Sequence, residues 1–394
     1  MSYLQETQDA GREMFPDLAR AWALIGIALV NVAYFAYPFA QNLYKAGGLE
    51  NSADFAAYFT VNALFTAKSY TLFSFMFGVG FAYQIMAAER RGIGFSGRYW
   101  RRIIGLFFFA AINILFLFQG DILFIYAVLG ILLLAFKNAK PQTLIRLAII
   151  FYGVQILLLI SIAAFATSSP GEMDIAVQEM IESEAVRTQI FADGGFVPVI
   201  SARIGEWTGF VFYGLFGQGL AVMSFFLFGL AAVRNNLISN PGAPFWQKCR
   251  RIYLPIGLLI SLAGAWLVLT GSTALSARTA WGNTLIFLGS PFATAGYLGL
   301  IAKWSLTPNG PIKLFFARGG TSSLTAYLLQ GLLLSLVFYE YGFGLYMQIG
   351  AAACIAIALI VALFSIAFTS LWRTVFKRGL LEAILRSWTY LGTR

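Results

Sequence analysis

The residues best suited to chemistry lie in the stretch from Arg101 to Gly130. Asp121 stands at a predicted turn between two apolar runs, and Asn113 lies seven residues before Gly120, inside the first run. A carboxylate can accept a proton, whereas an amide near neutral pH can only hold a ligand by hydrogen bonds. The pair favours a polar site between two helices.

Other polar groups inside the apolar runs are candidates because burying them in a membrane is costly. Arg20 follows Asp17 by three residues, so the two can pair on one helix face, either as a structural pair or as part of a site. Asn31 lies eleven residues further on. Lys68 opens the next run, where it could extend to the headgroups, but we favour Asp121 as its partner because both lie at the same predicted depth.

These residues predict one polar cavity between the helices, with a cluster of arginines near one end. The expected cavity residues are Arg20, Asn31, Lys68, Asn113, Asp121, Tyr126, Gln330 and Glu340. The arginines expected to hold phosphate groups are Arg98, Arg101, Arg102 and Arg318. The glycines and hydroxyl residues after Arg318 suit an anion at a helix N-terminus, although helix capping explains them equally well.

Several kinds of site are excluded by residues that the chain lacks. It has no histidine, so histidine-based catalysis and histidine-ligated metals are excluded. Two cysteines, Cys249 and Cys354, make no disulfide framework. The sequence shows no cluster of metal ligands and no phosphate-binding glycine loop, so we expect no metal and identify no cofactor.

The composition places these residues in a polytopic membrane protein. The chain is 59% hydrophobic and 11% charged, with a mean hydropathy of +0.75. Continuous apolar runs of about 20 residues predict membrane-spanning helices rather than a barrel. We expect an all-α bundle forming one domain, 1–394, with about ten spans. These are 19–39, 65–87, 101–118, 121–136, 143–167, 208–233, 252–271, 281–302, 320–339 and 349–372.

The net charge of +10 lies mostly in alternate connections between these spans. Basic loops face the cytoplasm, so both termini are predicted there, with 1–18 as a cytoplasmic N-terminus and 373–394 as a cytoplasmic amphipathic tail. This pattern argues against nucleic acid as a partner. The acidic segment 168–207 is then extracytoplasmic, and its stretch 172–192 predicts an amphipathic helix, either a lid or a connector.

Two further patterns concern organisation. Residues 50–64 are half-apolar and are expected to lie along the outer interface before the second span. Ser74 to Gly78, with a basic loop after it, resembles Phe225 to Gly229 at an offset of 151 residues. Such a repeat occurs in transporters, but a span rich in phenylalanine and glycine followed by basic residues is also a generic pattern.

Several motifs together resemble the YeiB-like family of bacterial multi-pass membrane proteins, domain of unknown function 418. The first-span pattern matches Asp17 to Asn31, with Ala21 in place of the family's glycine. Leu72 to Gly80 matches the second pattern, and Gly120-Asp121-Ile122-Leu123 the hairpin. Gly319 to Gln330 and Gly379 to Tyr390 match the C-terminal patterns, the last without its proline.

The resemblance implies a multi-pass protein of the bacterial inner membrane with membrane lipids around it. The family is distantly similar to transmembrane acyltransferases, which implies an acyl or lipid-like ligand and, by analogy alone, acyl-CoA. Many relatives have a histidine where this chain has Asn113, which argues against ordinary acyl transfer. A transporter or exporter of a small organic solute, and a non-catalytic binding or scaffold protein, therefore remain alternatives.

Overall fold

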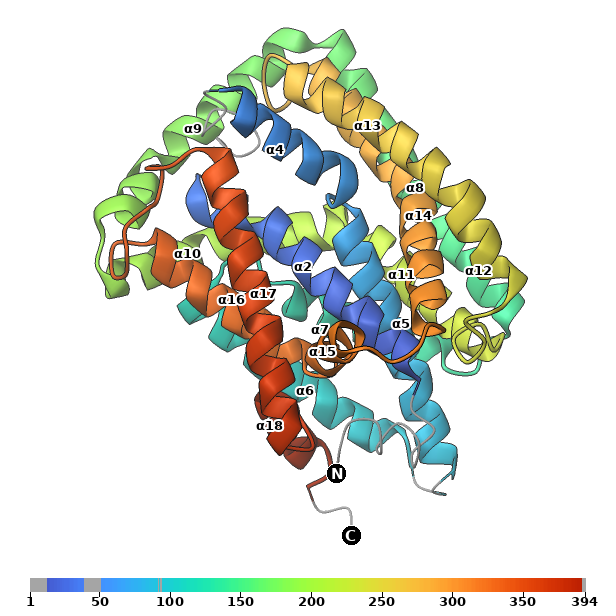
Figure 1. Cartoon of the computed structure of the whole chain (residues 1–394). Coiled ribbons are helices and arrows are strands. Elements are labelled where there is room, and N and C mark those ends of the chain that lie inside the picture. Colours follow the sequence, from blue (N-terminus) through green and yellow to red (C-terminus); the bar gives the residue numbers. More distant parts are fainter. Residues whose placement is uncertain (1–12, 39–50, 91, 93, 392–394) are drawn as a thin grey trace.

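The structure is a computed structural model that describes residues 13–38, 51–90, 92 and 94–391. Its regular elements in these ranges are all helices, so the predicted all-α class is confirmed. Figure 1 shows the long helices of the bundle, with the last described helix, α18 (Leu380–Thr389), at one end of the molecule. This end is called the termini end below.

Seven segments of the described chain are long and apolar enough to cross a membrane. They are α2 (Met14–Ala36), the segment Ser52–Arg90, the segment Ser96–Leu117, α8 (Pro141–Ser168), the segment Pro244–Thr270, α14 (Ala277–Ser305) and α17 (Ala351–Val375). The number rises to nine if two bent helix pairs each count as one span. The predicted polytopic membrane protein is confirmed.

The remaining elements lie within these segments or between them. Ser52–Arg90 comprises α4 (Ser52–Leu64) and α5 (Lys68–Arg90), and Ser96–Leu117 comprises α6 (Ser96–Ile112) and the π-helix η1 (Asn113–Leu117). Pro244–Thr270 comprises α12 (Pro244–Lys248), η4 (Cys249–Tyr253) and α13 (Leu254–Thr270). The predicted fourth span is a shorter apolar helix, α7 (Ile122–Leu133) with η2 (Leu134–Phe136).

One predicted span is interrupted, and another is preceded by a sharply bent helix, where glycines cluster. The span predicted at 208–233 is divided, because α10 (Phe196–Phe212) and η3 (Tyr213–Gly217) meet α11 (Gly219–Arg234) at 56°. At the ninth span, α15 (Pro311–Gly320) meets α16 (Ser323–Phe338) at 85°. Glycine is a weak helix former and leaves the backbone free to turn. Hydropathy alone did not predict these bends.

The two copies of the predicted repeat pack against each other. A Cβ atom on Gly78 of α5 would lie 2.0 Å from the carbonyl oxygen of Phe226, and one on Gly229 of α11 would lie 2.1 Å from that of Phe75. Gly78 corresponds to Gly229 and Phe75 to Phe226 at the offset of 151, so the contact is reciprocal. Small residues let the two backbones approach this closely.

Another tight helix pair is α13 with α14. A Cβ atom on Gly264 would lie 2.7 Å from the carbonyl oxygen of Gly282, and one on Gly282 would lie 2.7 Å from that of Gly264.

At the C-terminus of α14, Lys313 donates to the carbonyl oxygens of Ser305 (2.7 Å) and Thr307 (2.6 Å). The buried ammonium group therefore stabilises the C-terminus of α14.

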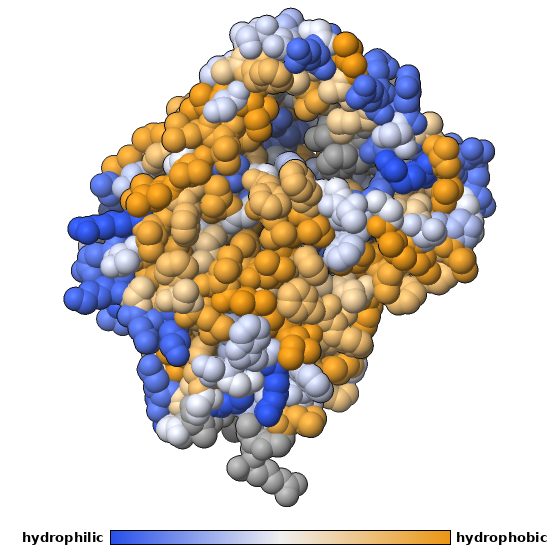
Figure 2. All heavy atoms as spheres, turned by 180° about the vertical axis from the view of Figure 1, so that it is seen from behind, coloured by the Kyte–Doolittle hydropathy of each residue, from blue (hydrophilic) through white to orange (hydrophobic). Residues whose placement is uncertain are grey.

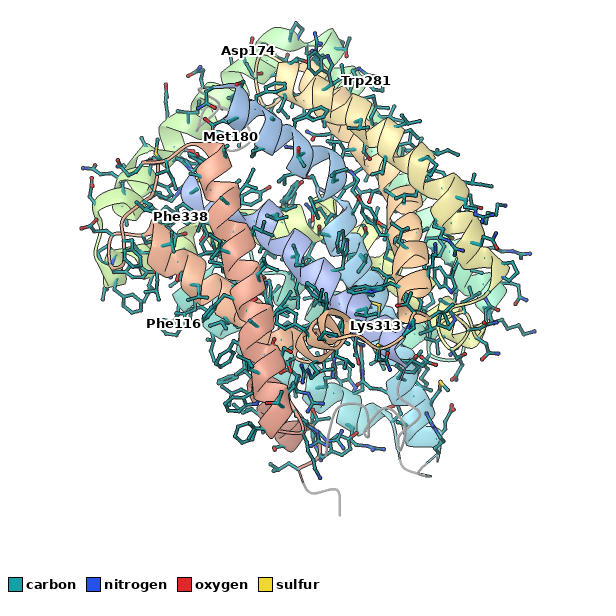
Figure 3. All side chains as sticks on the ribbon, in the orientation of Figure 1. Phe116, Asp174, Met180, Trp281, Lys313 and Phe338 are labelled. Atoms are coloured by element: carbon teal, nitrogen blue, oxygen red, sulfur yellow. The ribbon has the colours of Figure 1, made fainter. Side chains whose placement is uncertain are left out.

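The segment expected along the outer interface forms a helix over residues 52–64, and the helix predicted at 172–192 is present. α4 begins at an Asn51 cap, and its buried Asp54 accepts from the backbone N–H of Ala352 (2.8 Å) at the start of α17. The second helix is α9 (Pro170–Asp193), whose Val177 side is turned inward. α4 and α9 lie at the end away from the termini (Figure 1). Figure 3 shows Asp174 and Trp281 at that same end.

The exterior fits a membrane environment. Large apolar side chains such as Ile149, Leu157 and Leu259 are exposed, and Phe116 of η1 also lies at the surface (Figure 3). Figure 2 shows apolar side chains over the middle of one face, with hydrophilic side chains gathered towards its edges. Lipid tails would cover such a face. The predicted cytoplasmic position of the termini stays a prediction.

Candidate functional site

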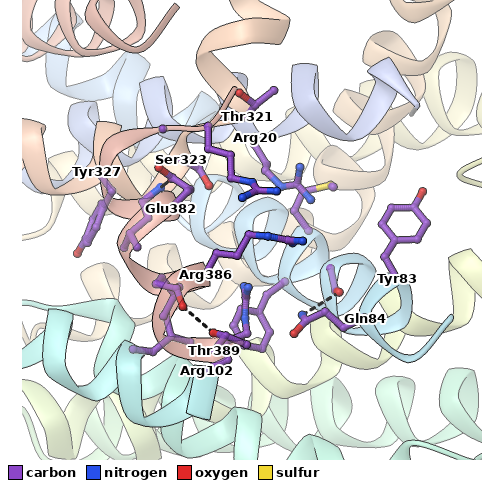
Figure 4. Close-up of a pocket in the computed structure, with 18 of the residues that line it drawn as sticks. Arg20, Tyr83, Gln84, Arg102, Thr321, Ser323, Tyr327, Glu382, Arg386 and Thr389 are labelled. Carbon is purple, nitrogen blue, oxygen red and sulfur yellow. Dashed lines mark hydrogen bonds between the residues drawn. The ribbon is translucent and has the colours of Figure 1, made fainter. Parts of the chain in front are cut away.

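A cavity of about 510 Å³ opens near the termini end and is called the basic cavity here. Its positively charged lining residues are Arg20, Arg102, Arg373, Lys377, Arg378 and Arg386, and its carboxylate is Glu382. Figure 4 shows Arg20 and Arg386 directed towards the middle of the cavity, with Tyr327 and Glu382 to one side and Gln84 to the other. The lining therefore carries an excess of positive charge.

The C-terminal segment folds back to form one wall of this cavity. Helix α18 (Leu380–Thr389) contributes Glu382, Leu385, Arg386 and Thr389 to the lining. It docks on α6, where the indole N–H of Trp388 donates to the carbonyl oxygen of Arg101 (2.8 Å). The tail is therefore part of the site.

Glu382 fixes the other side of α18. Its carboxylate accepts from the backbone N–H groups of Leu324 (2.7 Å) and Thr325 (3.2 Å) and from the Thr325 hydroxyl (2.6 Å). These groups belong to the first turn of α16, where a negative charge is favourable. Desolvation in these surroundings raises the pKa of Glu382 above its ordinary value, although the hydrogen bonds oppose that shift.

This contact answers the prediction of an anion at the start of the ninth span. The N-terminus of α16 does hold an anionic group, and that group is a carboxylate of the protein's own tail. Thr321 and Ser323 nevertheless line the basic cavity beside it. Ser322 at the N-cap makes no capping hydrogen bond to α16, so the Glu382 carboxylate, and not the hydroxyl residues, accepts from the free N–H groups of this helix end.

The cationic side chains of the basic cavity differ in the ion pairs, hydrogen bonds and ring contacts that they make within the protein. Arg20 pairs with Asp17 at 2.9 Å, as the spacing predicted, and Arg373 donates to the Thr321 hydroxyl at 2.9 Å. Arg386 lies over the Tyr390 ring, 4.4 Å from its centroid. The Nε atom of Arg102 is buried and has no hydrogen-bond partner among the described residues. Arg102 is therefore the arginine most available to a ligand.

The inner end of the basic cavity is apolar and aromatic. It is lined by Phe73, Met76, Phe77, Leu106, Leu123, Tyr126 and Tyr327. The Tyr126 hydroxyl lies 2.7 Å from that of Ser74 and donates to the carbonyl oxygen of Tyr70 (3.1 Å). Charge at one end and apolar side chains at the other suit an amphipathic anion.

Behind Tyr327 lies a buried polar cluster that consists of Asn113, Asp121 and Tyr327. The Asn113 amide donates to Asp121 Oδ1 (2.6 Å), and the Tyr327 hydroxyl donates to the same oxygen (3.5 Å). Asp121 Oδ2 accepts from the backbone N–H of Phe124 (2.7 Å), so Asp121 caps α7. Asn113 begins the π-helix η1, and such helices often occur at functional sites.

Asp121 also lines a second cavity, of about 120 Å³, on the far side of this cluster. A third cavity, of about 610 Å³, adjoins the second, and both are lined by Tyr34, Tyr70, Tyr213 and Gln218. The third is called the distal cavity here, because α4 and α9 at the end away from the termini contribute to it. The polar cluster thus lies between the basic cavity and the distal side.

The expected cavity residues are distributed over several spaces rather than one. Arg20 and Tyr126 line the basic cavity, and Asn31 and Asp121 line the second. Asn113 and Gln330 line a small void of about 10 Å³ together with Asn31 and Tyr327. Gln330 donates to the Ser365 hydroxyl (3.0 Å). Lys68 and the exposed Glu340 line none of these cavities.

The predicted pair of Lys68 and Asp121 is wrong. Lys68 is buried at the start of α5, and its ammonium group donates to the carbonyl oxygen of Asn62 (3.4 Å). Among the described residues Asp121 is engaged by Asn113, Phe124 and Tyr327 instead. A similar depth in the membrane does not bring two side chains together when their helices face different neighbours.

Of the four arginines predicted to bind phosphate, only one lines the basic cavity. Arg102 lines the basic cavity. Arg98 donates to the carbonyl oxygen of Gly94 (3.1 Å), and Arg101 to that of Leu391 (2.6 Å), and neither lines the cavity. Arg318 also lies outside the lining.

Sequence reasoning missed most of the basic cavity. Arg373, Lys377, Arg378 and Arg386 were interpreted as topological charges of a tail, and Glu382 as part of a family motif. The available signal was the amphipathic pattern of the tail together with its match to the family's closing motif. Nothing local showed that the tail returns to the start of α16.

Comparison with known proteins gives the family. The chain is 30% identical to the uncharacterized protein YxaH of Bacillus subtilis over all of its own length and 98% of that protein. It is 26% identical to the uncharacterized protein YeiB of Escherichia coli, with 96% of both chains covered. Residues 232–392 match the family described as Protein of unknown function (DUF418). The chain belongs to this YeiB-like family. No solved structure matches it.

Proposed function

We propose that this DUF418 protein binds a phosphate-bearing acyl donor in its basic cavity and passes the acyl group towards the distal side of the membrane. The observation that carries the proposal is the basic cavity itself, which joins an excess of cations to an apolar inner end that stops at the Asn113–Asp121–Tyr327 cluster. With the termini in the cytoplasm, as the positive-inside rule predicts, the donor enters from the cytoplasm of the bacterial inner membrane.

The charge of the cavity supports a phosphate. Arg102, Lys377 and Arg386 line it without an ion pair among the described residues, whereas Arg20 is held by Asp17. Arginine forks match phosphate oxygens and form charge-assisted hydrogen bonds with them. The buried Nε of Arg102 would gain a partner on binding. Acyl-CoA carries phosphates and a thioester-linked acyl chain, so we propose it as the donor.

The inner end supports an acyl chain. Phe73, Met76 and Phe77 of α5 offer apolar surface there, and each buried methylene of a ligand gains about 0.8 kcal/mol. The acyl carbonyl would then lie next to Tyr327, whose hydroxyl contacts Asp121.

Asp121 supplies the proton acceptor that the missing histidine would otherwise supply. In the proposed step an acceptor oxygen bonds to the acyl carbon, the carbon–sulfur bond breaks, and the thiolate leaves. The hydroxyl proton of the acceptor passes to the Asp121 carboxylate and returns to the thiolate. Asn113 orients the carboxylate through its 2.6 Å hydrogen bond, a role that needs no proton transfer by the amide.

The test uses the full chain purified in detergent and three probes: palmitoyl-CoA, coenzyme A and an uncharged palmitoyl ester. We expect palmitoyl-CoA to bind more tightly than either of the others, because it alone has both phosphate groups and an acyl chain. Release of free thiol from palmitoyl-CoA in membranes measures the transfer. Equal binding of all three probes, or absence of any binding, would contradict the proposal.

Transport of a small organic anion is a second candidate, favoured by the two large cavities on either side of one polar cluster. Palmitoyl-CoA added to vesicles that contain the full chain separates acyl transfer from transport. In vesicles a transporter would accumulate the intact thioester, whereas an acyltransferase would release thiol in proportion to the acyl group transferred.

A further inference from the structure

The distal cavity is lined mainly by apolar side chains, with a few polar groups, and it is not basic. Its charged lining residues are Glu184, Arg187 and Glu206, and Arg187 lies 3.5 Å from Glu206. Two carboxylates against one guanidinium disfavour an anionic ligand, because a phosphate or carboxylate would meet like charge. The donor proposed for the basic cavity therefore does not suit this one.

One buried polar group of the distal cavity has no hydrogen-bond partner among the described residues, namely the hydroxyl of Tyr70. The half-buried Asn283 lines the same cavity, where its amide can reach a ligand. Buried polar groups in native proteins are normally paired, so an unpaired hydroxyl that lines a cavity indicates a ligand or a water molecule.

The rest of the lining suits a small molecule with hydroxyl groups. Aromatic side chains at Tyr34, Tyr58 and Phe210 offer apolar faces, and Thr208 and Gln218 add hydrogen-bonding groups. Ligand sites commonly combine such apolar walls with a few polar groups that fix orientation. A cavity of about 610 Å³ has room for a molecule of sugar size.

The position of Tyr70 connects this site to the proposed chemistry. Tyr70 lines both the distal cavity and the adjoining 120 Å³ cavity, and Asp121 lines the latter. A hydroxyl group held at Tyr70 from the distal side would therefore point towards Asp121.

We infer that the distal cavity binds an uncharged polyhydroxylated molecule of sugar size and presents one of its hydroxyl groups towards Asp121 as the acyl acceptor. The acceptor role rests on the proposed function, whereas the binding can be measured without it. Tyr70 and Asn283 are the positioning residues for this ligand.

The experiment compares three versions of one hexose, namely glucose, glucuronate and glucosamine, on the full chain in detergent. Half-saturating concentrations come from ligand-induced thermal stabilisation. We expect glucose to bind at least tenfold more tightly than either charged version. Tyr70→Phe and Asn283→Ala should each weaken glucose binding about fivefold, the loss of one neutral hydrogen bond. Ser161→Ala, at an exposed position of α8, is the control and should change nothing.

Three outcomes would overturn the inference: no stabilisation by any hexose, equal binding of all three, or unchanged glucose binding in both cavity variants. Palmitoyl-CoA binding is measured on the same samples. If it persists while glucose fails, the inference fails and the proposed function stands. If glucose binding passes every test while palmitoyl-CoA fails, the distal site stands and the acyl acceptor role does not.

Discussion

The basic cavity and the distal cavity share two helices, α2 and α5, and differ in the charges that line them. Helix α2 gives Arg20 to the basic cavity and Tyr34 to the distal one, about 21 Å apart along the helix at 1.5 Å per residue. Helix α5 gives Phe77 and Gln84 to the first and Tyr70 to the second. The tail adds its cations only to the first.

This difference shows how one helical bundle can form two cavities of unlike charge. Apolar and aromatic side chains line both cavities, whereas the charged ones come from α2, α6, α17 and the tail in the basic cavity and from α9 and α10 in the distal one. The Asn113–Asp121–Tyr327 cluster lies between the two cavities, so its carboxylate can face the distal side while its tyrosine faces the basic one. The difference in charge between the two cavities and the role of the Asn113–Asp121–Tyr327 cluster can be tested with separate variants.

The largest effect is expected from Asp121→Asn, which alters the separating cluster. Asparagine caps a helix nearly as well as aspartate, so α7 should form, but the amide cannot accept the proton. We expect thiol release from palmitoyl-CoA to fall by about 100-fold or more, the usual contribution of a general base, with palmitoyl-CoA binding unchanged. Unchanged thiol release in a folded variant would remove Asp121 from the mechanism.

The next effect concerns the charge of the basic cavity alone. Arg102→Gln should weaken palmitoyl-CoA binding about 10- to 100-fold, because a charge-assisted hydrogen bond to phosphate is lost. Glucose binding at the distal cavity should not change. Arg98→Gln, four residues earlier on α6 and outside the cavity lining, is the matched control. Equal losses in both variants would indicate a diffuse charge effect rather than a site.

A third prediction addresses α5, the helix that both cavities share, and its packing against α11. Gly78→Ala places a Cβ atom 2.0 Å from the Phe226 carbonyl oxygen, a backbone atom, so α5 and α11 must separate. We expect a loss of about 1–3 kcal/mol of stability, measured as a lower thermal midpoint in detergent. Gly80→Ala, two residues on, meets nothing within 4 Å and should be neutral or slightly stabilising. Similar midpoints for the two variants would contradict this account of the packing.

The smallest effect is the pH dependence of the tail that closes the basic cavity. Because the pKa of Glu382 is raised in the folded protein, the fold binds this proton more tightly than the unfolded chain does. Stability should therefore fall as the pH rises from the ordinary value of 4.5 through the raised pKa. The Glu382→Gln variant cannot titrate at this position, so its thermal midpoint should lack this fall as the pH rises above 4.5. Parallel pH curves for the two proteins would exclude Glu382 as the cause.

Much of the architecture was predictable from local sequence. Continuous apolar runs gave the membrane class and the helices, and the Gly120-Asp121 step gave the hairpin whose aspartate caps α7. The spacing of Asp17 and Arg20 gave their ion pair. Asn113 was correctly expected to be buried. Each of these features depends on residues close together in the chain, or on the cost of placing a polar group in lipid.

The partners across the bundle were decided by tertiary structure alone. Lys68 and Asp121 share a predicted depth but meet different neighbours, and Arg102 lines the basic cavity while Arg98 does not. Glu382 reaches the first turn of α16 from 58 residues further along the chain. Hydropathy and helical periodicity fix how deep a side chain lies and which face it occupies. Which distant helix that face meets depends on packing between whole helices, and that packing distributed the expected cavity residues over the basic cavity, the second cavity and a small void.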